Sequence, residues 1–128
     1  MSDFIISPPE TTEWRLTPDE LAQGIASRWP DAEVGRREKP AVHEALSFRL
    51  REAGGQIEGW LAESGQSIHL DAPSVDDVAP FVLWLRRQVP PEQPLLFYDQ
   101  GFNSQVALTG DEALTESDLV ERFESSAV

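Results

Sequence analysis

The chain contains no cysteine, and its 128 residues include only two histidines, one methionine and one tyrosine. The absence of cysteine excludes disulfides, thiolate nucleophiles and cysteine-based zinc sites. Small secreted domains commonly depend on disulfides, so this absence favours a reducing compartment, and we expect a cytoplasmic protein. Because histidine is also scarce, the usual catalytic chemistry is poorly represented, and a binding protein is favoured over an enzyme.

The sequence also lacks the long apolar runs that membrane insertion or secretion requires. Its longest strongly apolar run covers residues 79–85. That run is far shorter than the roughly 20 residues that a membrane-spanning helix needs. The N-terminal stretch MSDFIISPP has no basic region and only a short apolar one, unlike a secretory signal. We therefore expect a soluble protein.

Basic residues are few in comparison with acidic residues. The chain carries 23 Asp and Glu against 10 Lys and Arg, which gives a formal net charge of −13. Residues 95–128 hold seven acidic residues and one basic residue, so the last quarter carries nearly half of the excess. A field of this sign repels nucleic acid and anionic lipid, so neither is an expected partner. It attracts a basic protein, although the same charge also serves solubility alone.

No motif of catalysis or cofactor binding is present. The chain has no GxxxxGK[ST] loop, no dinucleotide-binding glycine fingerprint, no HExxH and no GxSxG. His69 and Asp71 are expected on one strand face, where a carboxylate can orient a general base, but no strong nucleophile accompanies them. His43 and His69 lack the spacing of a metal-binding pair. We therefore predict no catalytic residue, no cofactor and no metal site.

Oxygen-bearing side chains gather late in the chain. Asp99 and Asn103, followed by Asp111 and Glu112, are ligand types that calcium accepts, but their spacing does not match an EF-hand loop. The stretch from Asp99 to Asn103, with Gly101 between them, instead fits a hairpin turn, because these residue types have the backbone preferences that turns require. A turn is therefore favoured over a cation site.

Three helices are predicted from their caps and from apolar residues at helical spacing. Thr17, Ser74 and Thr115 are the expected N-caps, each with an acidic residue three positions later. The first helix ends at Pro30. In the second helix, Pro80 leaves two alternatives open, because the helix either bends at the proline or begins there.

Strand patterns occur in seven segments, several of them linked by glycine turns. The segments are 4–6, 33–37, 45–51, 56–62, 67–70, 95–98 and 105–108. Segments 4–6 and 33–37 are predicted as short edge strands. The order β-α-β-β-β-β-α-β-β-α predicts a single α+β domain over residues 1–128, with a mainly antiparallel sheet of five to six strands and helices on one face. Residues 1–3 and 125–128 are expected to fray.

Aromatic residues supply the candidate binding positions. Trp60 lies on the strand face opposite Ile57 and Leu61, where it is either an exposed interface anchor or covered by a second helix. Phe102 falls at the tip of the predicted hairpin and is the other candidate anchor. The predicted partner-binding residues are Trp60, Asp99, Phe102, Asp111 and Glu112.

Three stretches of the second half carry a resemblance to a known group of proteins. They are FVLWLRRQVP from Phe81, LFYDQGFN from Leu96 and VALT from Val106. This pattern resembles small acidic bacterial immunity proteins of polymorphic toxin systems, over residues 74–123, and its motifs are structural rather than catalytic. The resemblance implies a cytoplasmic bacterial protein that binds and blocks a basic toxin domain. It carries over no functional residue.

Three functions remain open at this point. A non-enzymatic acidic protein-binding module is favoured by the charge, by the absence of catalytic motifs and by the resemblance. A small-ligand binder or small enzyme would use a pocket between sheet and helices, with His69 and Asp99 nearby. A homo-oligomeric structural protein would form a homodimer through the edge at 4–6 or through the face that carries Trp60.

Overall fold

The computed structural model describes residues 2–10, 12–35, 44–52, 55–62, 64–110 and 114–126, which contain seven strands and three helices. The strands are β1 (Ser2–Ser7), β2 (Glu33–Gly35), β3 (Glu44–Glu52), β4 (Gly55–Ala62), β5 (Ile68–Ala72), β6 (Leu95–Asp99) and β7 (Gln105–Leu108). The helices are α1 (Pro18–Arg28), α2 (Val75–Gln88) and α3 (Glu116–Ser125). The predicted α+β class and order of elements are confirmed.

All seven strands form one antiparallel sheet in the order β2-β3-β4-β5-β1-β6-β7. The expectation of five to six strands is therefore corrected to seven. The sheet is larger because both short segments are paired, β2 with β3 and β1 with β5 and β6. The predicted edge position is right for β2, which borders the sheet.

The edge position is wrong for β1, which lies in the interior of the sheet between β5 and β6. Phe4 and Ile6 are buried in the core. Ser2 and Asp3, which we expected to fray, are paired with β5. A three-residue apolar run does not distinguish an edge strand from a buried one, because its neighbours come from distant parts of the sequence. This interior place also removes residues 4–6 as an edge through which two subunits could pair.

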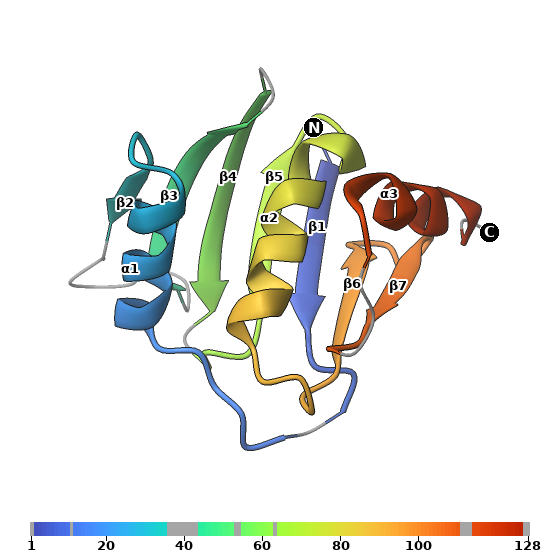
Figure 1. Ribbon diagram of the computed structural model, residues 1–128, viewed down its shortest axis with the longest axis horizontal. Helices are drawn as coiled ribbons and strands as arrows, with labels where there is room; N and C mark the ends of the chain where they lie inside the picture. Colours follow the sequence, from blue (N-terminus) through green and yellow to red (C-terminus); the bar gives the residue numbers. More distant parts are fainter. Residues whose placement is uncertain are drawn as a thin grey trace.

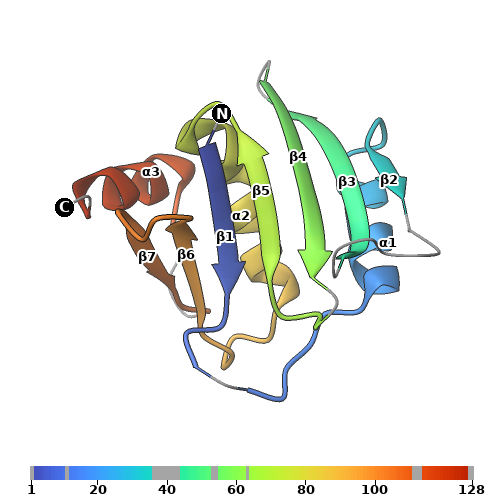
Figure 2. The same ribbon diagram turned by 180° about the vertical axis from the view of Figure 1, so that it is seen from behind.

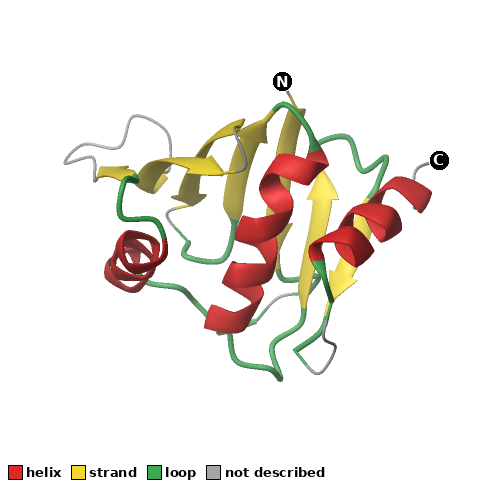
Figure 3. Cartoon of the chain, turned by 45° about the horizontal axis from the view of Figure 1, so that its top comes forward, coloured by secondary structure: helices red, strands yellow, loops and turns green. Residues whose placement is uncertain are grey.

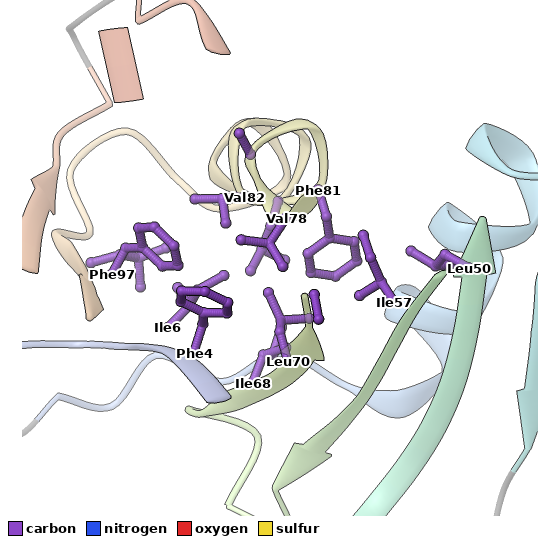
Figure 4. Close-up of a cluster of buried hydrophobic side chains, with 14 of the residues drawn as sticks. Phe4, Ile6, Leu50, Ile57, Ile68, Leu70, Val78, Phe81, Val82 and Phe97 are labelled. Carbon is purple, nitrogen blue, oxygen red and sulfur yellow. The ribbon is translucent and has the colours of Figure 1, made fainter. Parts of the chain in front are cut away.

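The three helices cover one face of the sheet (Figures 1 and 3). Helix α2 packs against β4 and β5, α1 against β3, and α3 against α2 and β7. Figure 4 shows Val78 and Phe81 of α2 above the buried side chains of Ile6 and Leu70, with Phe97 beside them. The opposite face of the sheet carries no helix in the described ranges (Figure 2). The core thus lies on one side of the sheet only.

The helix starts follow the predicted caps. The Glu20 N–H donates to Thr17 Oγ1 at 3.2 Å, and Thr115 forms a reciprocal capping box with Asp118 at the start of α3. Helix α2 begins at Val75 and continues through Pro80, so the proline does not start it. Pro80 lacks the N–H that would bond within the helix, and the apolar face of α2 supplies the stability instead.

Candidate functional site

The open face is the name that we give to the side of the sheet without helices. On β5, Leu70 is buried under the helices, whereas the alternating His69 and Asp71 are half-buried on the open face. On β4, Ile57 and Leu61 are buried, so Trp60 points to the open face. No described helix lies on this face of the sheet (Figure 2), so none covers Trp60; its side chain is half-buried, and its role as an anchor stays a prediction.

The central row is a line of four half-buried side chains that crosses the open face. Trp60 on β4 is the register partner of His69 on β5. His69 is opposite Ile5 on β1, which in turn is opposite Tyr98 on β6. The rings of Trp60 and His69 stack with their centroids 4.8 Å apart and their planes at 6°. Four strands, of which only β4 and β5 are consecutive in the sequence, thus build one continuous, largely apolar strip.

The turn between β6 and β7 extends the central row. Phe102 is 60% exposed and is the one large apolar side chain that is exposed in the described part of the chain. Its ring stacks on Tyr98 at 4.4 Å between centroids. The backbone of Phe102 has a φ of 56°, a left-handed conformation that costs a bulky residue about 1 kcal/mol or more. Both predicted anchors, Trp60 and Phe102, therefore lie along one strip.

Asp99 has a structural role in this turn. Its Oδ1 accepts the N–H groups of Asn103 at 2.7 Å and Ser104 at 3.2 Å, as expected for a turn residue. Asp99 is the register partner of Phe4, so its side chain lies on the helix side of the sheet and not on the open face. The other two predicted binding residues, Asp111 and Glu112, lie outside the described residues, as does His43.

A line of charged side chains runs beside the central row. Register pairing joins Glu33, Arg49, Glu58, Asp71 and Asp3 across five neighbouring strands. Arg49 forms ion pairs with Glu33 at 3.4 Å and with Glu58 at 3.2 Å. We call the remaining run of Glu58, Asp71 and Asp3 the acidic row, because it places three carboxylates on adjacent strands.

The acidic row is electrostatically unbalanced at its centre. Asp71 lies between Glu58 and Asp3, and like charges directly opposite each other destabilise a sheet. Among the described residues, no ion pair joins Asp71 or Asp3 to a cation. The Oδ1 atom of Asp71 is buried and has no hydrogen-bond partner there. A buried acceptor without a donor loses hydration that nothing replaces, so this carboxylate carries an uncompensated cost in the fold.

His69 adds no positive charge to this surface at neutral pH. Burial lowers the pKa of His69 from its ordinary value of 6.5, and the nearby Asp3 carboxylate acts in the opposite direction with a smaller effect. The imidazole is therefore neutral at pH 7, which suits its stacking on Trp60. The centre of the open face is apolar and its flank is negative.

A shallow groove of about 520 Å³ lies where the two rows meet. Its lining includes Trp60 from the central row and Asp71 and Glu58 from the acidic row. Arg49 and Glu33 also line it. The groove therefore offers an aromatic plane and carboxylates side by side, which are the two groups that bind a guanidinium or ammonium group.

A second hollow, of about 310 Å³, lies on the helix side of the sheet. It is lined by Phe4, Asp99 and Phe123, together with residues at the start of α2. His69 lies on the other side of the sheet, so the structure separates the two residues that we expected to share a ligand pocket. The strand register explains this correction. His69 is opposite Ile5 and Asp99 is opposite Phe4. Because consecutive residues of β1 point to opposite faces of the sheet, His69 and Asp99 do so as well.

Comparisons with protein-family models, with curated proteins and with solved structures returned no match. In the described ranges, no helix has both the length and the apolar character to cross a membrane. The same residues contain no group of three His, Asp or Glu side chains placed to hold a metal ion. The open face is therefore the candidate site that the geometry itself supplies.

Sequence reasoning found parts of this site and missed the rest. Trp60 and Phe102 were identified from strand alternation and from the turn. The acidic row was missed, because Asp3, Glu58 and Asp71 come from three separate segments, and their alignment depends on the interior place of β1. The alternation of buried and open-face positions along β4 and β5 was a usable signal for Glu58 and Asp71.

Proposed function

We propose that this chain is a non-enzymatic binding module whose open face binds a positively charged protein surface. The observation that carries the proposal is the acidic row, which runs beside an uncovered strip of apolar side chains. Of its three carboxylates, that of Glu58 pairs with Arg49, whereas those of Asp71 and Asp3 have no cation in the described part of the chain. A basic partner would supply that cation.

The ion pairs that Arg49 forms within the sheet support a cationic partner. Arg49 lies between Glu33 and Glu58 on neighbouring strands and contacts both. Asp71 occupies the corresponding place between Glu58 and Asp3, but it is itself an acid. A Lys or Arg from a partner at this place would repeat the arrangement around Arg49 and relieve the repulsion across β5.

The central row supports a protein partner rather than a small ion. An interface usually combines an apolar centre that contains aromatic residues with a polar rim. Trp60, Ile5 and Tyr98 provide such a centre, and the acidic row provides one rim. The net charge of −13 would also accelerate the encounter with a basic protein and disfavour nucleic acid or an anionic membrane.

The resemblance to immunity proteins supplies one specific partner within this proposal. The partner would be a basic toxin domain in the bacterial cytoplasm, and the open face would block it by binding. A chain without cysteine is suited to that reducing compartment. The charge of the open face also argues against two copies pairing through it, because the two acidic rows would face each other.

The experiment compares three baits in a lysate of the organism that encodes the chain. The first bait is the wild type. The second carries Asp3→Asn, Glu58→Gln and Asp71→Asn, which remove the acidic row. The third carries Glu13→Gln, Glu92→Gln and Glu121→Gln, three exposed acids outside the strands that form the open face. The two variants lose the same charge, so long-range attraction falls equally in both.

We expect a basic protein to be retained by the wild type and the third bait and to be lost from the second. The retained protein is then purified, and its Kd is measured by calorimetry for all three chains. A tenfold or larger weakening is expected for the acidic-row variant only, since it removes charge-assisted contacts of about 1.5–3 kcal/mol each. Equal binding by both variants, or no retained protein, would contradict the proposal.

A further inference from the structure

The tip of the β6–β7 hairpin combines exposure with backbone strain. Phe102 is the exposed large apolar residue noted above, and its φ of 56° lies in the left-handed region. Gly101 and Asn103, whose residue types adopt this conformation most readily, flank Phe102 but do not occupy it. The chain thus places an aromatic residue at a position where another residue type would fold with less strain and expose less apolar surface.

The hairpin tip is held firmly in this conformation. The Phe102 N–H donates to the carbonyl oxygen of Asp99 at 3.0 Å, and the Asp99 carboxylate accepts the two N–H groups that follow. The ring of Phe102 stacks on Tyr98, whose hydroxyl is 3.0 Å from Ser7 Oγ. The ring is therefore ordered before any partner arrives, which lowers the entropy cost of binding.

The tip also adjoins the acidic row. The N–H of Gln100 donates to the backbone carbonyl of Asp3 at 3.1 Å, which ties the turn to the last residue of that row. Strained, well-ordered residues cluster at functional sites, and a few anchoring residues, often aromatic, carry most of the binding energy of many interfaces. Exposure, strain and ordering thus coincide at one residue beside the proposed binding surface.

We infer that Phe102 is the anchoring residue of the open face, and that it inserts into an apolar pocket flanked by Lys or Arg on the partner. This inference rests on the proposed function and specifies the shape of the partner: a cavity for one aromatic ring beside cations that reach the acidic row. The partner is a different protein and not a second copy, because a copy would bring further carboxylates to the tip.

The test uses the full chain and the partner purified with the baits above. Phe102→Gly and Phe102→Asn remove the ring and relieve the left-handed backbone, and Phe102→Tyr keeps the ring. Val120→Ala in α3 is the control for loss of a half-buried apolar side chain elsewhere. Calorimetry gives Kd, and urea unfolding gives the midpoint of each variant.

We expect Kd to rise at least about 30-fold for Phe102→Gly and Phe102→Asn, the ratio that corresponds to about 2 kcal/mol for an anchoring residue. Phe102→Tyr and Val120→Ala should stay within about threefold of the wild type, a change of under about 0.7 kcal/mol. The urea midpoints of Phe102→Gly and Phe102→Asn should equal or exceed that of the wild type, because the backbone strain is relieved. A structural role for the ring would instead lower both midpoints.

The outcomes separate this inference from the proposed function. If Phe102→Gly binds normally while the acidic-row variant does not, Phe102 is not the anchoring residue and the proposed function stands. If both variants bind normally, or if no bait retains a partner, both are wrong. Lower urea midpoints for the two ring-removing variants would overturn the anchor. So would a wild-type dimer in light scattering that Phe102→Gly dissociates, because the ring would then serve a second copy.

Discussion

Asp71 is the residue at which the cost to folding and the proposed binding role meet most clearly. Its side chain lies between two other carboxylates, and one of its oxygens is buried without a hydrogen-bond partner among the described residues. Replacement by Asn keeps the shape and removes the charge. We expect Asp71→Asn to raise the free energy of unfolding by about 0.5 kcal/mol, the scale of one cross-strand pair.

Urea unfolding at low salt measures this change, and Glu121→Gln on α3 is the matched control with the same loss of charge. The control should leave the free energy of unfolding nearly unchanged, because surface charges contribute little. A decrease for Asp71→Asn would show that its carboxylate is stabilised by the fold, and the acidic row would then be a structural feature. An increase together with weaker partner binding supports a binding role.

His69 makes stability depend on pH. Because burial lowers its pKa in the folded state, the unfolded chain binds more protons once the pH falls below the ordinary value of 6.5. The contribution of neutral His69 is thus fully present above pH 6.5 and is lost as the pH falls through the lowered folded-state pKa. The carboxylate of Asp3 reduces this loss without reversing it.

We therefore expect His69→Gln to flatten the decline in the free energy of unfolding between about pH 7 and about pH 5. Urea unfolding at a series of pH values measures both chains, and their difference above pH 6.5 should be constant. Parallel curves over the whole range would show that His69 is equally easy to protonate in the folded and unfolded chains. That result would contradict the effect of burial.

At the scale of elements, β3 and β4 pack closely because Gly59 of β4 has no side chain. Gly59 on β4 is the register partner of Phe48 on β3. A Cβ at Gly59 would lie 2.5 Å from the Phe48 ring and 2.8 Å from the carbonyl oxygen of His69. Gly35 on β2 is a matched control, because a Cβ there would lie 3.6 Å from Ser47 Oγ, an ordinary contact.

We expect Gly59→Ala to lower the free energy of unfolding by about 1–3 kcal/mol, as overpacking of a core does. The ring of Phe48 would have to move, and it stacks on Phe81 of α2 at 5.2 Å, so the strain would spread to the helix layer. Gly35→Ala should change stability by less than about 0.5 kcal/mol. Similar losses in thermal or urea unfolding for both variants would contradict this account of β4.

Local signals were sufficient to predict most elements. The caps at Thr17 and Thr115 fixed the helix starts, and alternation in 56–62 and 67–70 placed Trp60 and His69 on one face. Pairing between distant segments was not predictable from such signals, because β1 reaches its neighbours only through long connections. The acidic row therefore emerged only with the register, whereas the positions of Trp60 and Phe102, the two predicted anchors, followed from local alternation and turn chemistry.

At the scale of the whole molecule, the two faces of the sheet are divided between the core and the proposed binding surface. The buried core and all three helices lie on one face (Figures 1 and 2). Strand alternation and register place the acidic row on the other face. The acidic excess after residue 94 does not supply the acidic row. The described acidic residues after residue 94 include four of α3, which packs on the helix side of the sheet. They are Glu116, Asp118, Glu121 and Glu124.

This division leads to opposite effects of salt on folding and on binding. A net charge of −13 repels itself in the compact state, so screening should stabilise the fold. Screening should also weaken the attraction between the open face and a basic partner. We expect the melting temperature to rise between about 0.02 M and about 0.5 M NaCl, over which the Debye length falls from about 20 Å to about 4 Å, while Kd increases. With increasing salt, Kd should rise less for the acidic-row variant than for the control variant with substitutions at Glu13, Glu92 and Glu121. Equal salt dependence of Kd in both variants would mean that the partner responds to total charge rather than to the open face.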